Sequence, residues 1–390
     1  MAQRPKLQII AKRREGHVIL SMDVHSDPLK PWIMASHADG NVSIWDYQTE
    51  AKVSEFRVSD VEGTDTWHNT HWICSAKFIA PKDWIVAGGG DGYIYVVSYK
   101  MRELNMTTQQ VKKFKAHGGI RFFMGEKDRG KWVESLAVHP TQPYVLSASM
   151  DNLIKLWNHD SNWDCIWSFS GHDSFVKHVM FSPDGNHFAS ASDDCTVKIW
   201  NIRKPKAIAT LACGQDAQQH VAYFSRGDSQ YVITGSLRGS ARVWNLQTNK
   251  KTKILPGTTP ENKDLEGLDY EVHGCNIGVI NLDQDNTNPV LITVSKDMSI
   301  SFLDQTSYAP RFEELNDLSR GPPQDFAYIE STRSLVIACP RGIAIVDMSE
   351  QMDDDMSDNT NDDTNEDTDV RPKRRRLEPK WMADYVMIKD

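Results

Sequence analysis

The sequence predicts an all-β protein in which seven four-stranded sheets close into a ring. Three observations predict this fold: a short motif recurs along the chain, its spacing is nearly constant, and a strand at the N-terminus is available to complete the last unit. The stretch SASMDNLIKLWN at 147–158 has a near twin, SASDDCTVKIWN at 190–201, which lies 43 residues later. Both end in a run that alternates polar and apolar residues, as a half-buried strand does.

Seven segments share the form of a short β-branched and aromatic run, usually entered through a Gly, Asp or Asn turn. They lie at 41–48, 91–99, 152–159, 195–202, 240–247, 298–305 and 342–349. Upstream of most of them lies a second apolar run such as YVLSAS, and before that a third such as VESLAVHP. Each unit therefore supplies three strands, and we expect an outer fourth strand to follow.

The spacing of the units is regular wherever no insertion occurs. The equivalent tryptophans Trp157, Trp200 and Trp244 lie 43 and 44 residues apart. Longer spacings coincide with polar, Gly-containing insertions, which we expect to be loops on one face of the array. These insertions cover 61–71, 118–131 and 256–267. Because four-stranded sheets with two apolar faces cannot stand alone, the seven units must stack radially.

The two ends of the repeat region are expected to meet in one sheet. The last unit, DFAYIESTRSLVIACPRGIAIVD, supplies only three strands. The alternating run KLQIIAKR, at about residues 6–13, is the candidate for its fourth strand, and this pairing would remove two free sheet edges. We therefore predict one domain over residues 1–349, followed by a tail at 350–390.

These units resemble the WD-repeat β-propeller family, and the fourth unit carries the clearest match. It reads GHDSFVKHVMFSPDGNHFASASDDCTVKIWN and contains the family's structural hydrogen-bonding set, which is His172, Ser190, Asp194 and Trp200. The corresponding set in the third unit is His117, Ser147, Asp151 and Trp157. The resemblance implies that these residues satisfy buried polar groups and have no catalytic role.

Two other units depart from this pattern. In the fifth unit Arg238 stands at the Asp position, and no Gly-His pair precedes it. In the first unit the Gly-His pair at 16–17 is out of register, so that Glu15 falls at the histidine position. We therefore expect no complete hydrogen-bonding set in either unit.

Several longer stretches are similar to the N-terminal propeller of the coatomer β′ subunit family. They include DVHSDPLKPWIMAS (23–36), SAKFIAPKDWIVAG (75–88) and SLAVHPTQPYVLSAS (135–149), and the similarity covers roughly residues 17–250. No α-solenoid pattern follows the repeats, so we expect the cage-forming part of that family to be absent.

The propeller of that family reads C-terminal dilysine signals, with basic side chains for the carboxylate and acidic ones for the lysines. By the resemblance, these pocket positions fall on Val18, Leu20, Ala38, Cys74, Lys131 and Met150. None of these side chains has the character that the dilysine pocket requires. We therefore expect the scaffold to be retained and the dilysine pocket to be lost.

The same ring positions predict a protein-binding surface on the top face of the propeller. Its candidate residues are Trp72, Trp132, Met150, Phe175, Lys177 and His220. The three aromatic residues come from consecutive units and would form an arc, and aromatic and Met side chains are common anchors of protein interfaces. The alternative is that each ring packs against its own insertion loop.

No catalytic, cofactor or metal site is predicted. The sequence contains no GxSxG, P-loop or HExxH motif, and GGGDGYIY belongs to a strand-turn-strand segment. No basic stripe with interleaved aromatic residues suggests direct binding of nucleic acid. The six cysteines are scattered and predict reduced thiols, and no apolar run is long enough to cross a membrane. Any membrane association is therefore expected to be peripheral.

The tail changes composition abruptly. From 350 to 369 the chain has ten acidic residues and no basic one, which predicts disorder. The following RPKRRR resembles a nuclear localisation signal read by importin, with Lys373, Arg374, Arg375 and Arg376 as candidates. The alternative is that this basic cluster folds onto the acidic run. The apolar residues at 381–388 are candidates for docking on a partner or on the propeller.

The resulting interpretation is a non-catalytic protein-interaction scaffold in the cytoplasm, with the tail as a route to the nucleus. One alternative is an accessory of the COPI coat in vesicle trafficking, which would locate the protein on Golgi and COPI-coated membranes. Another alternative is a nuclear adaptor or a substrate receptor of a ubiquitin ligase. An enzyme is the least favoured class, and composition does not name the partner.

Overall fold

A computed structural model describes most of the repeat region. The described residues are 7–12, 18–58, 72–102, 105–118, 131–237, 239–255, 277–280, 290–294, 300–308, 324–339 and 342–348. Arg238, most of the predicted insertions and the tail with Lys373, Arg374, Arg375 and Arg376 lie outside the described residues.

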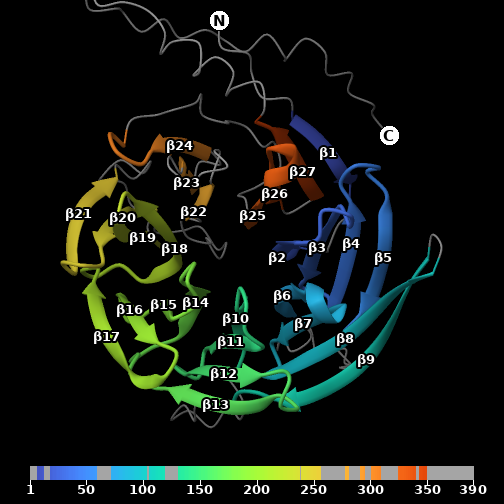
Figure 1. The fold of residues 1–390 in the computed structure, drawn as a ribbon, viewed down its shortest axis with the longest axis horizontal. Coiled ribbons are helices and arrows are strands. Elements are labelled where there is room, and N and C mark those ends of the chain that lie inside the picture. Colours follow the sequence, from blue (N-terminus) through green and yellow to red (C-terminus); the bar gives the residue numbers. More distant parts are fainter. Residues whose placement is uncertain are drawn as a thin grey trace, which may run out of the picture.

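The described residues form an all-β propeller, in which the sheets are arranged as the blades of a ring, with the first strand of most sheets nearest its centre (Figure 1). They contain no α-helix and only two short 3₁₀ turns, η1 (Ala80–Lys82) and η2 (Glu330–Thr332). No helix in this part of the chain is long and apolar enough to cross a membrane.

Each complete blade has four antiparallel strands. The first three blades, each listed from the centre outward, are β2 (Ile19–Val24), β3 (Trp32–His37), β4 (Asn41–Asp46) and β5 (Lys52–Arg57); β6 (Ile73–Ile79), β7 (Trp84–Gly89), β8 (Tyr93–Arg102) and β9 (Asn105–Lys115); and β10 (Val133–Val138), β11 (Tyr144–Ser149), β12 (Ile154–Asn158) and β13 (Asp164–Phe169). The next two are β14 (Val176–Phe181), β15 (His187–Ser192), β16 (Thr196–Asn201) and β17 (Lys204–Ala212); and β18 (Gln218–Arg226), β19 (Ser229–Ser236), β20 (Ala241–Asn245) and β21 (Lys250–Leu255).

The sixth complete blade joins the two ends of the described chain. It consists of β25 (Asp325–Ile329), β26 (Ser334–Cys339), β27 (Gly342–Asp347) and the N-terminal strand β1 (Leu7–Lys12). β1 pairs antiparallel with β27 from Leu7 opposite Val346 to Lys12 opposite Gly342. This pairing covers the free edge of β27, so that the ring is held together by backbone hydrogen bonds.

The structure describes six four-stranded blades, one fewer than the seven predicted. The remaining sheet has three described strands, β22 (Ile277–Ile280), β23 (Val290–Val294) and β24 (Ile300–Asp304). The residues that follow β24 after Tyr308 lie outside the described part, and sequence repetition alone could not show whether they pair there.

Apolar clusters between neighbouring sheets hold the propeller together. Trp200 is fully buried between the blades of β10–β13 and β14–β17 and stacks on Phe188 with ring centroids 5.9 Å apart. A similar cluster lies between β22–β24 and the blade of β25–β27, where Phe302 and Val346 are fully buried. The period-2 pattern of the strands produces these clusters because alternate side chains face each neighbour.

The turn between the second and third strands of five blades needs a residue with positive φ. Gly40, Gly92 and Gly239 provide it in three blades, with φ between 82° and 86°. At Gly92 a Cβ atom would lie 2.8 Å from the carbonyl oxygen of His117. Asn152 and Cys195 occupy the same position in the other two blades with φ of 67° and 65°. These turns point side chains toward the top face.

Candidate functional site

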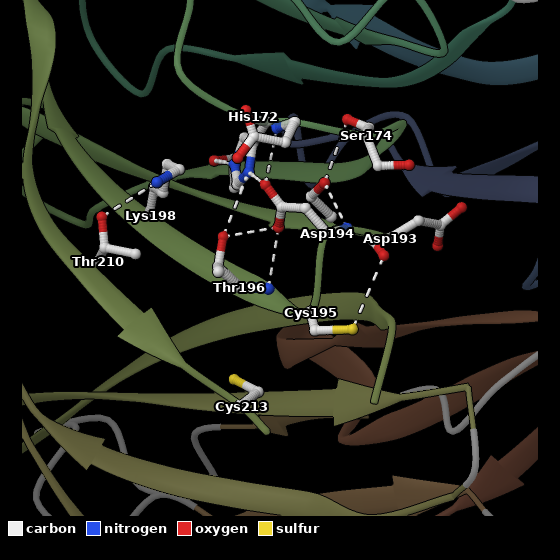
Figure 2. A network of polar contacts seen from close by, with 12 residues as sticks. His172, Ser174, Asp193, Asp194, Cys195, Thr196, Lys198, Thr210 and Cys213 are labelled. Atoms are coloured by element: carbon white, nitrogen blue, oxygen red, sulfur yellow. Dashed lines mark hydrogen bonds and ion pairs between the residues drawn. The ribbon is translucent and has the colours of Figure 1, made fainter. Parts of the chain in front are cut away.

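The blade of β14–β17 contains a buried chain of four polar side chains, part of which is drawn in Figure 2. The Trp200 indole N–H donates to Ser190 Oγ at 2.8 Å, and Ser190 Oγ lies 2.7 Å from His172 Nε2. His172 Nδ1 lies 2.6 Å from a carboxylate oxygen of Asp194, which can only accept, so this nitrogen carries the proton. The Ser190 hydroxyl then donates to His172 Nε2, so that every donor in this network has an acceptor.

Asp194 is the last member of this hydrogen-bond network, and it also orders the turn in which it lies. It accepts hydrogen bonds from the backbone N–H of Asp173 at 3.0 Å and from the Thr196 hydroxyl at 2.6 Å. Burial alone would raise the pKa of Asp194, but the hydrogen bonds from His172 and Thr196 outweigh it and lower that pKa. The carboxylate therefore ties the loop before β14 to the turn before β16.

The blade of β10–β13 repeats this arrangement. His117 Nδ1 lies 3.0 Å from Asp151, His117 Nε2 lies 2.7 Å from Ser147 Oγ, and Trp157 Nε1 donates to the same hydroxyl at 2.9 Å. Burial lowers the pKa of His117, even though Asp151 opposes that change. Both sets predicted from the sequence are thus brought together within their own blades, with no free reactive group.

In two other blades, polar side chains are paired by residues that were not predicted from the sequence. In the first blade His37 Nε2 lies 2.7 Å from Ser43 Oγ, and Trp45 Nε1 donates to that hydroxyl at 3.2 Å. In the blade of β18–β21, Arg242 pairs with Asp216 at 2.6 Å. The paired residues lie on different strands or loops, so the Gly-His signature does not mark them.

A cavity of about 570 Å³ lies at the centre of the top face. Trp72 and Trp132 come from neighbouring blades, and both line it, with ring centroids 5.2 Å apart and planes inclined by 50°. Met150 and Leu237, which follow β11 and β19, also line it. Aromatic and aliphatic side chains thus make up part of its wall.

A β-bulge near the start of each of five inner strands aims one further side chain into this cavity. The register of the strand pairs skips one residue in each of β2, β6, β10, β14 and β18. The skipped residues are Leu20, Cys74, Glu134, Lys177 and Gln219, and all five line the cavity. A bulge re-aims the side chain of its extra residue, so the repeated irregularity builds the wall of the cavity.

The polar side chains of the cavity are arranged in neighbouring pairs. Lys177 Nζ lies 2.9 Å from Glu134, and the Gln219 amide donates to Asp193 at 2.8 Å. Burial would lower the pKa of Lys177, but Glu134 outweighs it and the pKa is raised. Burial and then the Glu134 charge raise the pKa of the Cys74 thiol well above its usual value, which makes it a poor nucleophile.

A second charged group also lines this cavity, in the central channel that the inner strands surround. Lys77 Nζ lies 3.3 Å from Asp23, and the carboxylate of Asp325 accepts from the backbone N–H of Met22 at 2.7 Å. Burial would lower the pKa of Lys77, but these two carboxylates outweigh it and the pKa is raised. The group therefore links the inner strands β2, β6 and β25.

His178 lies in the same part of the channel, with its ring 5.1 Å from that of His220. Burial and then the charge of Lys77 lower the pKa of His178 to about 4. Both histidines also border a second cavity of about 860 Å³, which opens toward the opposite face. Lys77, His178, His220 and Asp325 line both cavities, so charged and titratable side chains lie where the two cavities adjoin.

Comparison with known proteins agrees with this geometry. The family model described as "WD domain, G-beta repeat" matches residues 10–46, 108–158 and 163–201. This chain carries WD repeats. Among curated proteins, the WD-repeat chain is 36% identical to coatomer subunit beta'-2 of Arabidopsis thaliana over 251 residues, which are 64% of this chain and 24% of that protein.

The human coatomer subunit beta' is 30% identical over 219 residues, which are 56% of this chain and 21% of that protein. The WD-repeat chain therefore spans about a quarter of the length of the curated relatives that it matches. The predicted resemblance to coatomer β′ subunits is confirmed.

The WD-repeat propeller brings five of the six predicted top-face residues together. Trp72, Trp132, Met150, Lys177 and His220 all line the cavity. Phe175 does not, so the predicted three-ring arc is reduced to a pair of tryptophans. The backbone of Phe175 instead accepts from the N–H of Asp193 at 2.9 Å. Sequence reasoning placed Leu20, Cys74 and Lys177 in the ring, and all three are bulge residues. It missed Gln219 because it assigned the equivalent position of the fifth unit to His220, one residue later.

Proposed function

We propose that this WD-repeat propeller is a non-catalytic interaction scaffold whose top-face cavity binds a segment of a partner protein. The cavity that combines Trp72 and Trp132 with the half-buried Glu134–Lys177 pair is the observation that supports this proposal. Large rigid aromatic side chains beside desolvated polar groups are the usual composition of interface hot spots. The partner segment would place an apolar side chain beside the tryptophans.

The chemistry of the cavity argues against a dilysine ligand. Cys74 and Met150 line it at two positions where the coatomer β′ family would require charged side chains. Lys177 is already paired with Glu134, and Asp193 with Gln219. A dilysine peptide would lose several charge-assisted hydrogen bonds, each worth about 1.5–3 kcal/mol.

A photoreactive amino acid in place of Met150 would test this binding site in cells. We expect a distinct crosslinked protein that is lost when Trp72→Ala and Trp132→Ala are added. Trp167, a 37% exposed residue on the outer strand β13, offers a matched control position for the crosslinker. Thermal unfolding would verify that the double variant is folded.

Identical crosslinks from positions 150 and 167, or crosslinks at 150 that survive both tryptophan changes, would contradict the proposed site. A titration with a dilysine peptide should show no saturable binding in fluorescence anisotropy. Saturable binding that requires the free carboxylate would instead show that the family's dilysine pocket is present.

A coat-associated accessory is the second candidate, and the 36% identity to a coatomer subunit over 251 residues favours it. In this case the protein would associate peripherally with COPI-coated Golgi membranes. A fluorescent fusion should then give Golgi puncta and co-purify with coatomer. A diffuse signal without co-purification would reject this candidate.

We also propose that the three-stranded sheet β22–β24 is the seventh blade of a single domain over residues 1–349. It packs against the blade of β18–β21 through a cluster containing Leu291 and Val243, and against β26 and β27 through one containing Phe302. The sheet β22–β24 therefore contacts a blade on each side, as the seventh blade of a ring would. Protection of the β22–β24 amides from hydrogen exchange as one unit with the other blades would test this arrangement.

A further inference from the structure

The outer parts of two neighbouring blades carry charge of one sign. The segment 195–215, which contains β17, has four basic residues and no acidic one, and the segment 229–255, which contains β21, has five basic residues and no acidic one. The whole chain has a net charge of −9, so the positive charge of these two segments is opposite in sign to that of the chain as a whole. β17 and β21 are consecutive outermost strands on one side of the ring (Figure 1).

Six exposed side chains define a surface that we call the basic rim. They are Arg203, Lys204, Lys206, Lys250, Lys251 and Lys253. None of the six forms an ion pair with another described residue. Six like charges on adjacent strands repel one another, and an anionic partner would relieve that repulsion.

Protection of a sheet edge accounts for only part of this pattern. Lysine on an outer strand hinders the addition of further strands, and β9 also carries lysines. On β9, however, Lys112 contacts the Asn162 side chain at 2.7 Å and Lys113 lies 5.1 Å from the ring centre of Tyr95. Lys112 and Lys113 therefore have partners within the propeller, whereas no side chain of the basic rim forms an ion pair among the described residues.

The chain itself contains an anionic segment of matching size. The run 350–369 has ten acidic residues and no basic one, whereas the cluster at 371–376 has only five basic residues. The described chain ends at Met348, directly after β27. The blade of β21 lies two positions from β27 around the ring, separated from it by β22–β24.

The length of the acidic run is sufficient for this distance. Packed sheets lie about 10 Å apart face to face, and their outer edges diverge in a ring. Twenty residues span at most about 70 Å when fully extended. We propose that the acidic run 350–369 binds in cis to the basic rim on β17 and β21, so that the propeller masks its own basic surface.

Carbodiimide crosslinking of the full chain, which joins Lys to Asp or Glu at contact distance, tests this proposal. Mass spectrometry should find tail crosslinks on Lys204, Lys206, Lys250, Lys251 and Lys253 severalfold more often than on Lys115, the β9 lysine that is also exposed. The crosslinks between the tail and the basic rim should disappear at about 1 M salt, where the screening length falls to about 3 Å.

A full-chain variant with the ten acidic residues of 350–369 changed to their amides provides a second measurement. It should bind vesicles containing phosphatidylserine more strongly than the native chain, because the basic rim is exposed. Changing Lys250, Lys251 and Lys253 to Glu in that variant should abolish the gain, whereas Glu at Lys112, Lys113 and Lys115 should not.

Four outcomes would overturn the proposal. Equal crosslinking of β9 and the basic rim would show that the tail has no preferred contact. Crosslinks found only between the acidic run and Lys373 would show that the tail folds on itself. Crosslinks found only between two copies of the chain, or equal vesicle binding by the native and amide chains, would show that the basic rim is not masked in cis.

Discussion

Ser190 is expected to be the most sensitive small residue in the fourth repeat. It is fully buried, and its hydroxyl is shared by the Trp200 indole and the His172 imidazole. Ser190→Ala removes one oxygen atom and leaves both of these groups without a partner. The side-chain volume changes little, so the effect isolates hydrogen bonding from packing.

The expected cost follows from the two groups left unsatisfied. A buried donor or acceptor that loses its partner costs about 1–3 kcal/mol. With two such groups, we expect Ser190→Ala to lower the free energy of unfolding by about 2–6 kcal/mol. That is a large part of the ~5–15 kcal/mol that stabilises a typical protein.

Urea unfolding followed by tryptophan fluorescence would measure this change, with the slope of the transition checked for constancy. Ser147→Ala is a matched variant, because Ser147 has the same two partners in the third repeat. Thr234→Val is a weaker control, because both hydrogen bonds of the Thr234 hydroxyl are long: it accepts from Trp244 at 3.3 Å and donates to the Arg242 carbonyl oxygen at 3.5 Å. We expect this control to cost about 1 kcal/mol.

A double variant distinguishes hydrogen bonding from other causes. Ser190→Ala leaves the Trp200 indole N–H without an acceptor, and Trp200→Phe removes that N–H. The two changes together should therefore lower the free energy of unfolding by about 1–2 kcal/mol less than the sum of the single changes. Strict additivity, or a cost of Ser190→Ala no larger than that of Thr234→Val, would refute the conclusion that this hydrogen-bond network stabilises the protein.

Three further predictions concern charge. The pKa of His178 is lowered to about 4 from its ordinary value of 6.5, so the free energy of unfolding should fall as pH drops from about 6.5 to 4. His178→Gln should reduce the slope of that fall by up to ~1.4 kcal/mol per pH unit in urea titrations. Parallel curves for the two proteins would contradict this. Asp216→Asn should cost about 2–3 kcal/mol in urea unfolding because Arg242, with 11% of its side chain exposed, loses its ion pair, and a neutral effect would contradict this. Changing residues 373–376 to Ala should remove any nuclear signal of a fluorescent fusion, and an unchanged distribution would reject the nuclear localisation signal.

Features local to one repeat could be predicted from the sequence. The hydrogen-bonding partners of His172 and His117 lie within their own blades, at a spacing that the repeat itself displays. The pairing of β1 with the last blade was also foreseeable, because an unpaired alternating strand remained at the other end of the chain. Such features depend on periodicity and on the count of strands, which sequence records directly.

Features shared by several blades were decided only by the tertiary structure. The Trp72–Trp132 contact and the Glu134–Lys177 pair join residues from neighbouring blades. The bulges that aim such side chains inward are irregularities of strand pairing, which a period-2 pattern does not encode. Sequence by itself therefore determined the all-β repeat and its internal hydrogen bonds, whereas packing of the blades decided which side chains meet in the top-face cavity and which, like Phe175, do not.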